Sequence, residues 1–226
     1  MKGLIENQLS EISRTFFGYH LVRLGYLSSE IRLPHCPIKH QVSMTGQLQA
    51  ETSLLAKSTD LPIAENSVDT FVLAHELDFS NDPHQILREV DRAIMANGYL
   101  VLTGFNPFSL CGLFKHLPFN KGSVLHEARF FSCGRVKDWL QLLGFEIIDT
   151  KHLLFNELFL QRRIHQPSKW NAWATHYFAS LCTMYIIVAR KREIPLSIIK
   201  PKWQSNRKFS TVRANASARA GLNKVK

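Results

Sequence analysis

The sequence predicts an α/β fold built on a parallel sheet, because two buried strands flank one amphipathic helix between residues 68 and 103. Residues 68–74 and 99–103 are short, almost entirely apolar runs, which are typical of strands covered on both faces. Between them, apolar residues recur every three or four positions, as they do on one face of a helix. Two parallel strands joined by a helix form a right-handed βαβ unit.

Local signals mark both ends of this helix. Asp82 is a suitable N-cap, with Pro83 at the first helical position and Gln85 three residues after the cap. Asn97-Gly98 supplies a left-handed stop. The residues expected to face the sheet are Ile86, Leu87, Val90, Ala93 and Ile94.

The remaining sequence supplies the other elements of one domain, with irregular stretches over 26–60 and 106–131 and an aromatic-rich connection over 151–180. The aromatic connection is more typical of packing than of a cover over a substrate pocket. The other predicted elements are a helix over 3–17, strands over 19–24, 41–44, 145–148 and 183–190, and a helix from Ser132 to Gly144.

Positive charge is concentrated at the C-terminal end of the chain. Residues 200–226 hold eight Lys and Arg and no Asp or Glu, so the net charge of +10 falls to +2 for residues 1–199. A basic segment without apolar periodicity cannot bury enough surface to order itself. We therefore predict a domain over 1–199 and a disordered tail over 200–226. The tail is interpreted as a solubilising extension, with a weak nucleic-acid contact as the alternative.

Other features of the sequence predict a cytoplasmic protein without a membrane contact. No apolar run approaches the length that crosses a bilayer, and the N-terminal segment lacks the continuous apolar core of a signal peptide. The four cysteines form no CxxC pair, which suits a reducing compartment. They are Cys36, Cys111, Cys133 and Cys182.

The segment 61–108 carries a series of short motifs that together resemble one protein family. The motifs are Leu61-Pro62-Ile63, Ser67-Val68-Asp69, Asp82-Pro83, Leu87-Arg88-Glu89, Arg92 and Asn97-Gly98. They resemble the central part of class I S-adenosylmethionine-dependent methyltransferases of the type 11 group. The resemblance implies a Rossmann-like, seven-stranded sheet, mostly parallel with an antiparallel closing strand. It also implies S-adenosylmethionine as the cofactor and methyl transfer to an acceptor, a small molecule or a macromolecule, that the sequence does not identify.

The same resemblance implies where the cofactor would lie, across the carboxyl ends of the first strands. Gly25 matches one glycine of the family's turn after the first strand. Leu61 and Pro62 would lie beside the adenine. Ala74 and His75 would border the methionine part and the transferred methyl group.

Three sets of polar residues have plainer alternatives. His75 is a candidate general base, but a histidine that closes a strand end through hydrogen bonds is the favoured interpretation. His35, Cys36 and His40 lack both a fourth ligand and the spacing of a zinc finger, so we predict no metal site. The charged cluster 88–92 is interpreted as a solvated, salt-bridged helix face.

The turn after the first strand departs from the family's pattern. Arg23 stands where an acid is typical, Leu27 and Ser29 replace two glycines, and Pro34 and Pro37 interrupt the helix that should follow. Three acids that the family typically uses, including the one at position 23, are missing or displaced. These departures support an alternative function, a catalytically inactive binding or regulatory protein of the same fold.

Overall fold

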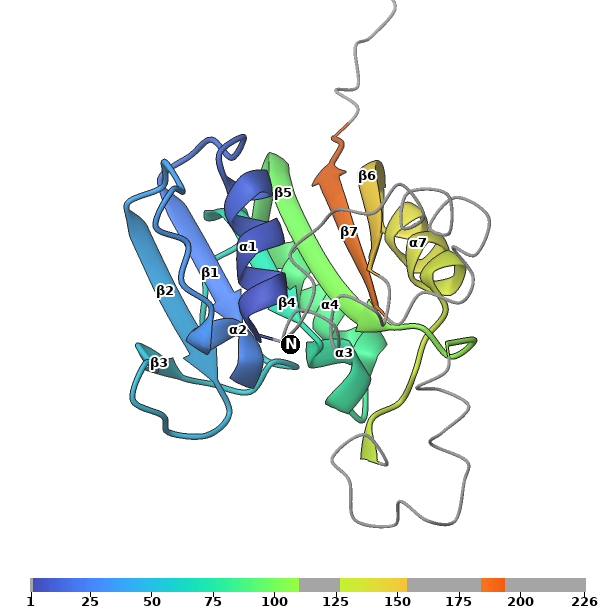
Figure 1. The fold of residues 1–226 in the computed structure, drawn as a ribbon. Coiled ribbons are helices and arrows are strands. Elements are labelled where there is room, and N and C mark those ends of the chain that lie inside the picture. The colour runs from blue at the N-terminus through green and yellow to red at the C-terminus, as the bar shows by residue number, and fades with distance from the viewer. Residues whose placement is uncertain (1, 110–126, 154–183, 194–226) are drawn as a thin grey trace, which may run out of the picture. The chain divides into compact units, whose positions relative to one another are not determined.

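The computed structural model describes residues 2–109, 127–153 and 184–193 (Figure 1). In this part of the chain seven strands form one sheet in the order β3-β2-β1-β4-β5-β7-β6. The five strands from β3 to β5 are parallel, and β7 runs antiparallel to both β5 and β6. The predicted α/β sheet is therefore confirmed. The basic tail and most of the aromatic-rich connection lie outside the described residues.

Five helices accompany the strands in the described part of the chain, and none of them is long and apolar enough to cross a membrane. The helices are α1 (Lys2–Ser13), α2 (Tyr26–Glu30), α3 (Glu76–Phe79), α4 (Pro83–Ala93) and α7 (Cys133–Leu142). The strands are β1 (His20–Leu24), β2 (His40–Thr45), β3 (Leu54–Leu55), β4 (Val68–Ala74), β5 (Ile94–Phe105), β6 (Phe145–Leu153) and β7 (Met184–Lys191).

The sheet buries apolar side chains on both faces, because successive residues of a strand point to opposite sides. On one face α1 packs against Leu21, Val72 and Val101 of the three central strands. On the other face α4 and α7 cover Val22 and Phe71, among others. Figure 1 shows α1 in front of the sheet and α4 behind it. Continuous apolar runs in the sequence reflect this double coverage.

The predicted start of α4 is confirmed, but its predicted end is wrong. The Asp82 carboxylate accepts a hydrogen bond of 3.0 Å from the backbone N–H of Gln85, and Pro83 opens the helix. Ile94, expected on the helix, is extended and begins β5. Asn97 has the expected positive φ of 63° but lies within β5, where the pairing with β4 changes register. The left-handed residue therefore forms an irregularity in the strand and does not end the helix.

Other predicted boundaries hold to different degrees. The first helix ends at Ser13, not at residue 17, because the Ser13 and Thr15 side chains bond to carbonyls of the last turn. Ser132 caps α7 as expected, and Gly144, with φ of 88°, follows its end. β3 and α3, with two and four residues, were not predicted from the sequence.

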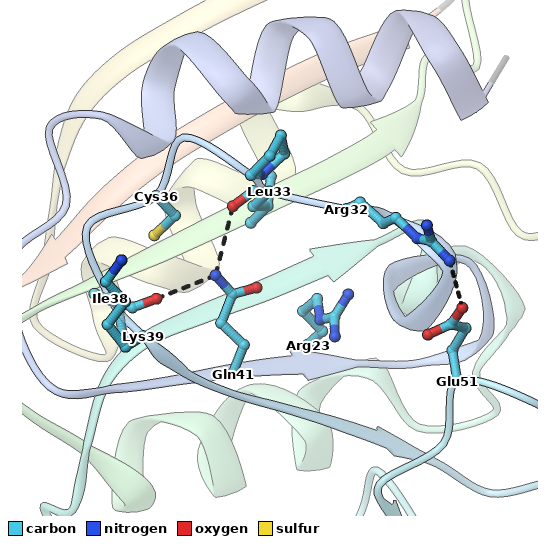
Figure 2. A pocket seen from close by; sticks show the side chains of 9 residues that line it. Arg23, Arg32, Leu33, Cys36, Ile38, Lys39, Gln41 and Glu51 are labelled. Carbon is cyan, nitrogen blue, oxygen red and sulfur yellow. Dashed lines mark hydrogen bonds and ion pairs between the residues drawn. The ribbon is translucent and has the colours of Figure 1, made fainter.

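The helix after β1 is unusually short. α2 ends at Glu30, and the segment 31–39, which contains Pro34 and Pro37, crosses the face of β1 and β2 without regular structure. It leaves a cavity of about 370 Å³ whose lining includes Arg23, Lys39 and Gln41 (Figure 2). The two prolines lack the backbone N–H that a helix would use, which explains why no helix fills this space.

Asp69, the acid of the Ser67-Val68-Asp69 motif, fixes the beginning of β1. Its carboxylate accepts hydrogen bonds of 2.8 Å from the backbone N–H groups of both Tyr19 and His20. A Cβ on Gly18, whose φ is 142°, would collide with the Asp69 side chain. The motif residue thus joins the α1–β1 connection to β4.

We predict that Asp69→Ala lowers the free energy of unfolding by about 1–3 kcal/mol, because two backbone donors lose a charged acceptor. Chemical denaturation monitored by circular dichroism measures this change. Asp138→Ala, which removes an exposed carboxylate on α7, should shift stability by less than about 0.5 kcal/mol. Equal stability of the two variants would contradict the role given to Asp69.

Candidate functional site

Gly25 directly follows β1 and forms the sharp turn into α2. Its φ of 101° and ψ of 168° lie in a region that residues with a Cβ rarely adopt. Its N–H donates to the carbonyl of Met44 in β2 at 2.9 Å, and its carbonyl accepts from Ser29 at 3.1 Å. The turn therefore sits at the carboxyl edge of the sheet, where parallel α/β folds place their ligands.

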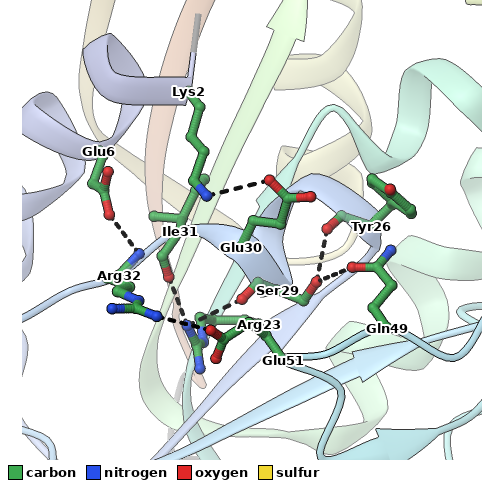
Figure 3. A network of polar contacts seen from close by, with 10 residues as sticks. All are labelled: Lys2, Glu6, Arg23, Tyr26, Ser29, Glu30, Ile31, Arg32, Gln49 and Glu51. Atoms are coloured by element: carbon green, nitrogen blue, oxygen red, sulfur yellow. Dashed lines mark hydrogen bonds and ion pairs between the residues drawn. The ribbon is translucent and has the colours of Figure 1, made fainter.

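Serine hydroxyls bond the turn to its neighbours. The Ser28 hydroxyl accepts a buried hydrogen bond of 2.6 Å from the backbone N–H of Ala74, at the end of β4. The Ser29 hydroxyl donates to the Tyr26 carbonyl at 2.7 Å and lies 2.9 Å from Oε1 of Gln49 (Figure 3). Ser29, which replaces a family glycine, thus connects α2 to the loop after β2.

Arg23, which replaces a family acid, also has a structural role. Its Nη1 donates to the carbonyls of Ile31 at 2.6 Å and Ser29 at 3.3 Å, which are orphan acceptors at the end of α2 (Figure 3). Burial lowers the pKa of Arg23, and the Glu51 carboxylate opposes that shift. A positive charge here stabilises the end of the short helix, where a carboxylate would repel the same carbonyls.

Glu76 is a candidate site residue that the sequence prediction missed. It follows His75 after β4, and a Cβ on Gly25 would collide with its carboxyl group. The Ser58 hydroxyl donates to this carboxylate, and the Tyr26 backbone N–H also bonds to it. Burial nevertheless raises the pKa of Glu76. The available signal was an acid placed directly after a buried strand, at the same edge as Gly25.

His75 lies at the end of β4 with only 2% of its surface exposed. Its Nδ1 is 2.8 Å from the Asp78 carboxylate, and its ring stacks on Phe105 with the centroids 4.0 Å apart. Its backbone N–H, at a φ of 56°, donates to the carbonyl of Thr103 at 3.1 Å. Within the described part of the chain, its Nε2 has no hydrogen-bond partner. This burial favours the strand-end interpretation over a general base in contact with an acceptor.

Leu61 and Pro62 are positioned by α4. Arg92 donates from Nη2 to the Leu61 carbonyl and from Nη1 to the Ile63 carbonyl, both at 2.9 Å. Glu89 accepts from the Leu61 N–H at 3.2 Å and pairs with Arg92 at 2.9 Å. The pair lowers the pKa of Glu89 and raises that of Arg92.

The interpretation of this helix face as solvated was therefore too simple. Glu89 and Arg92 hold the segment 61–63, whereas Arg88 of the same cluster is exposed as predicted. Asp91 lies 3.3 Å from the Lys191 ammonium group and so contributes to the contact between α4 and β7.

The structure brings most of the predicted site residues to one edge of the sheet. Gly25 and Ala74 are joined through the turn, and His75 follows Ala74 directly. Leu61 packs in the same core cluster as Leu24 and Leu77, which precede Gly25 and follow Glu76. Gly25, Ala74 and His75 thus lie at the carboxyl ends of β1 and β4, whereas Leu61 is placed by its hydrogen bonds to Glu89 and Arg92 of α4.

The three residues considered for zinc are not arranged as a metal site. His40 Nδ1 lies 2.9 Å from Nδ1 of His20, while Cys36 is buried beside the cavity under the segment 31–39. Among the described residues, no group of three or more His, Cys, Asp and Glu could hold a metal ion.

Comparison with known proteins identifies a matching family over the centre of the chain. Residues 37–102 match the family model of a type 11 methyltransferase domain, which begins after the Gly25 turn. The uncharacterized protein YafS of Escherichia coli is 37% identical over 203 residues, which span 90% of this chain and 81% of the relative.

Solved structures share the fold. A SAM-dependent methyltransferase from Archaeoglobus fulgidus superposes with a TM-score of 0.55 at 16% identity, over 84% of this chain and 95% of its own. One from Thermotoga maritima also gives 0.55, at 17% identity, over 85% of this chain and 100% of its own. At such low identity the likeness shows the fold alone.

We predict that Arg92→Lys lowers the free energy of unfolding by about 1–3 kcal/mol at neutral pH, because a lysine cannot bridge two carbonyls and a carboxylate together. Urea denaturation measures the difference. Glu89 has a lowered pKa, so the stabilisation from its pair is present above its unfolded pKa of about 4.3 and is lost as the pH falls through the folded value. The difference in the free energy of unfolding between parent and variant should therefore become smaller below about pH 4. A difference that does not change with pH would show that the pairing with Glu89 contributes nothing to stability.

Proposed function

Because the chain belongs to the class I S-adenosylmethionine-dependent methyltransferases of the type 11 group, we propose that it transfers a methyl group from S-adenosylmethionine to an acceptor. The observation that carries the proposal is the Glu76 carboxylate beside Gly25, at the carboxyl edge of the sheet. It places a carboxyl group where the sequence alone indicated that the family's acids were lost.

The chemistry of the residues at this edge fits the cofactor. S-adenosylmethionine carries a sulfonium and an ammonium cation together with one carboxylate. Gly25 allows a ligand to approach the backbone closely, and Glu76 would hold a cationic group. The Tyr26 N–H already donates to this carboxylate and favours its ionised form.

Glu76 makes the proposed site sensitive to pH. Burial raises the pKa of its carboxyl group, so a neighbouring cation would favour the ionised form. Cofactor affinity should therefore increase as the pH rises through the raised pKa of Glu76. If the carboxylate repelled the ligand, cofactor affinity would instead fall as the pH rises.

The bound cofactor would supply an electrophilic methyl group, which needs no metal and no covalent intermediate. The protein's contribution is to align an acceptor and to exclude water. The ends of β4 and β5 suit the exclusion of water, because Ala74, His75 and Thr103 are 1–2% exposed. Their burial leaves little room for solvent on that side of the region.

One observation favours the second candidate function, a catalytically inactive binding or regulatory protein. The Glu76 carboxyl group already lies against Gly25, so a ligand must share or displace it. Calorimetric titration with S-adenosylmethionine separates the two functions. We expect a dissociation constant of about tens of micromolar or weaker, because hydrogen bonds from the missing glycines and acids are lost. No heat and no thermal stabilisation at millimolar ligand would exclude the enzyme and leave the binding protein.

We predict that Glu76→Gln weakens binding of S-adenosylmethionine by about 10–100-fold, the expected loss for one charge-assisted contact. The same change should not lower the melting temperature at pH 7. A carboxyl group with a raised pKa is disfavoured when ionised in the folded protein, so a neutral amide of the same shape relieves that cost. Calorimetry and differential scanning fluorimetry measure the two effects.

Weaker binding without a lower melting temperature separates a binding role from a folding defect. Glu11→Gln, which removes an exposed carboxylate on α1, is the matched control and should leave both quantities unchanged. If Glu76→Gln binds as tightly as the parent protein, the carboxylate takes no part in holding the cofactor.

We predict that Gly25→Val weakens binding of S-adenosylmethionine and lowers the free energy of unfolding by about 1–3 kcal/mol. Both effects follow from the backbone angles of Gly25 and from the collision between a Cβ and Glu76. Gly134→Val on α7 is a control, since a Cβ there meets nothing within 4 Å. Titration at low temperature keeps the variants folded. A Gly25→Val protein that binds like the parent would make Gly25 a simple turn residue.

A further inference from the structure

The cavity under the segment 31–39 is a second candidate binding site, on the α1 face of β1 and β2 (Figure 2). We propose that it binds a small organic anion, in which a carboxylate or phosphate group is joined to an apolar body. Its volume of about 370 Å³ lies within the range of small-molecule sites. The proposal does not depend on methyl transfer, because none of its residues belongs to the Gly25–Glu76 site.

Positive charge predominates in the lining of the cavity. Arg23, Arg32 and Lys39 contribute cations, and Glu51 contributes a single carboxylate. Glu51 is paired with Arg32 at 2.9 Å, and Glu6, the other acid near Arg32, accepts that residue's backbone N–H at 2.8 Å. Neither acid forms an ion pair with Arg23 or Lys39 in the described part of the chain. An anionic group would balance this charge.

Arg23 is the best-positioned donor for that group. Its Nη1 is fixed by the carbonyls of Ser29 and Ile31, so the guanidinium group is held in place before a ligand arrives. Its Nε is buried without a hydrogen-bond acceptor, and its Nη2 has none among the described residues. A guanidinium group has five N–H donors, and carboxylate and phosphate oxygens are its strongest acceptors. Arg23 is therefore preorganised but incompletely bonded.

The rest of the lining is largely apolar and suits the body of the ligand. Leu33, Cys36 and Ile38 are buried side chains that border the cavity. Gln41 donates from Nε2 to the carbonyls of Ile38 at 3.1 Å and Leu33 at 3.5 Å. In Figure 2 its carbonyl oxygen points to the Arg23 side, where it could accept a hydrogen bond from a ligand hydroxyl. The combination favours an amphipathic anion over a bare inorganic ion.

Titration of the full chain with phenyl phosphate and with benzoate tests the proposal, using chemical-shift changes or calorimetry at low ionic strength. Saturable binding of either probe is expected, and the stronger of the two identifies the preferred anionic group. Inorganic phosphate, which has no apolar body, should bind at least about tenfold more weakly, and benzyl alcohol, which has no charge, should not bind. Absence of saturable binding for both anions at millimolar concentration would overturn the proposal.

Three variants assign binding to the cavity. Lys39→Gln and Arg23→Gln should each weaken phenyl phosphate binding by about tenfold. Glu51→Gln should strengthen it several-fold, since it removes the only carboxylate among the described residues of the lining and frees Arg32. Arg88→Gln, which removes an exposed charge on α4 behind the sheet, should have no effect.

The variants at Lys39 and Glu51 still test the proposal if the Arg23 variant fails to fold. Lys39 is exposed and bonds to no described residue, and the Glu51 pair is at the surface. Unchanged affinity in both the Lys39→Gln and Glu51→Gln proteins would place the bound anion elsewhere and contradict the proposal.

Discussion

One buried hydrogen bond, from the backbone N–H of Ala74 to the Ser28 hydroxyl, joins the end of β4 to α2, the helix that follows β1. The last N–H of a buried strand has no partner in the ladder, and leaving it unsatisfied costs about 1–3 kcal/mol. The bond brings α2 against β4, so that Gly25 and Glu76 meet. His75, which is 2% exposed, and Glu76, whose pKa is raised by burial, directly follow Ala74 and so lie beside this contact.

The departures from the family's turn are consistent with one another in the structure. Proline residues after α2 prevent a longer helix, and a short helix exposes its last carbonyls on the sheet. Arg23 bonds to those carbonyls, and Ser29 bonds both within α2 and toward Gln49. An arginine in place of an acid therefore follows from the shorter helix, so it is not by itself a sign of lost function. Glu76, at the end of the neighbouring strand, places a carboxyl group at the same edge.

Sequence reasoning succeeded where the signal is local. Asp82 and Pro83 act within one helical turn, and the apolar runs of β4 and β5 are visible residue by residue. Ile94 was misplaced because an apolar residue fits a helix face and a strand equally well. The contact of Arg92 with Leu61 joins segments 31 positions apart, and no local pattern encodes it. Glu76 was missed because a carboxylate in the sequence gives no indication of whether it will be buried or exposed.

The strand order has a consequence for how the chain folds during synthesis. β7, the last strand of the sheet, lies between β5 and β6, with side chains such as Ile186 and Ile187 fully buried. Until residues 184–191 have been made, β5 presents an unpaired apolar edge, and β6 has no strand to join. Such an edge can pair with another chain and so promotes aggregation. A ribosome that stalled before Met184 would therefore release a polypeptide missing an interior strand, which chaperones would have to protect until it is degraded.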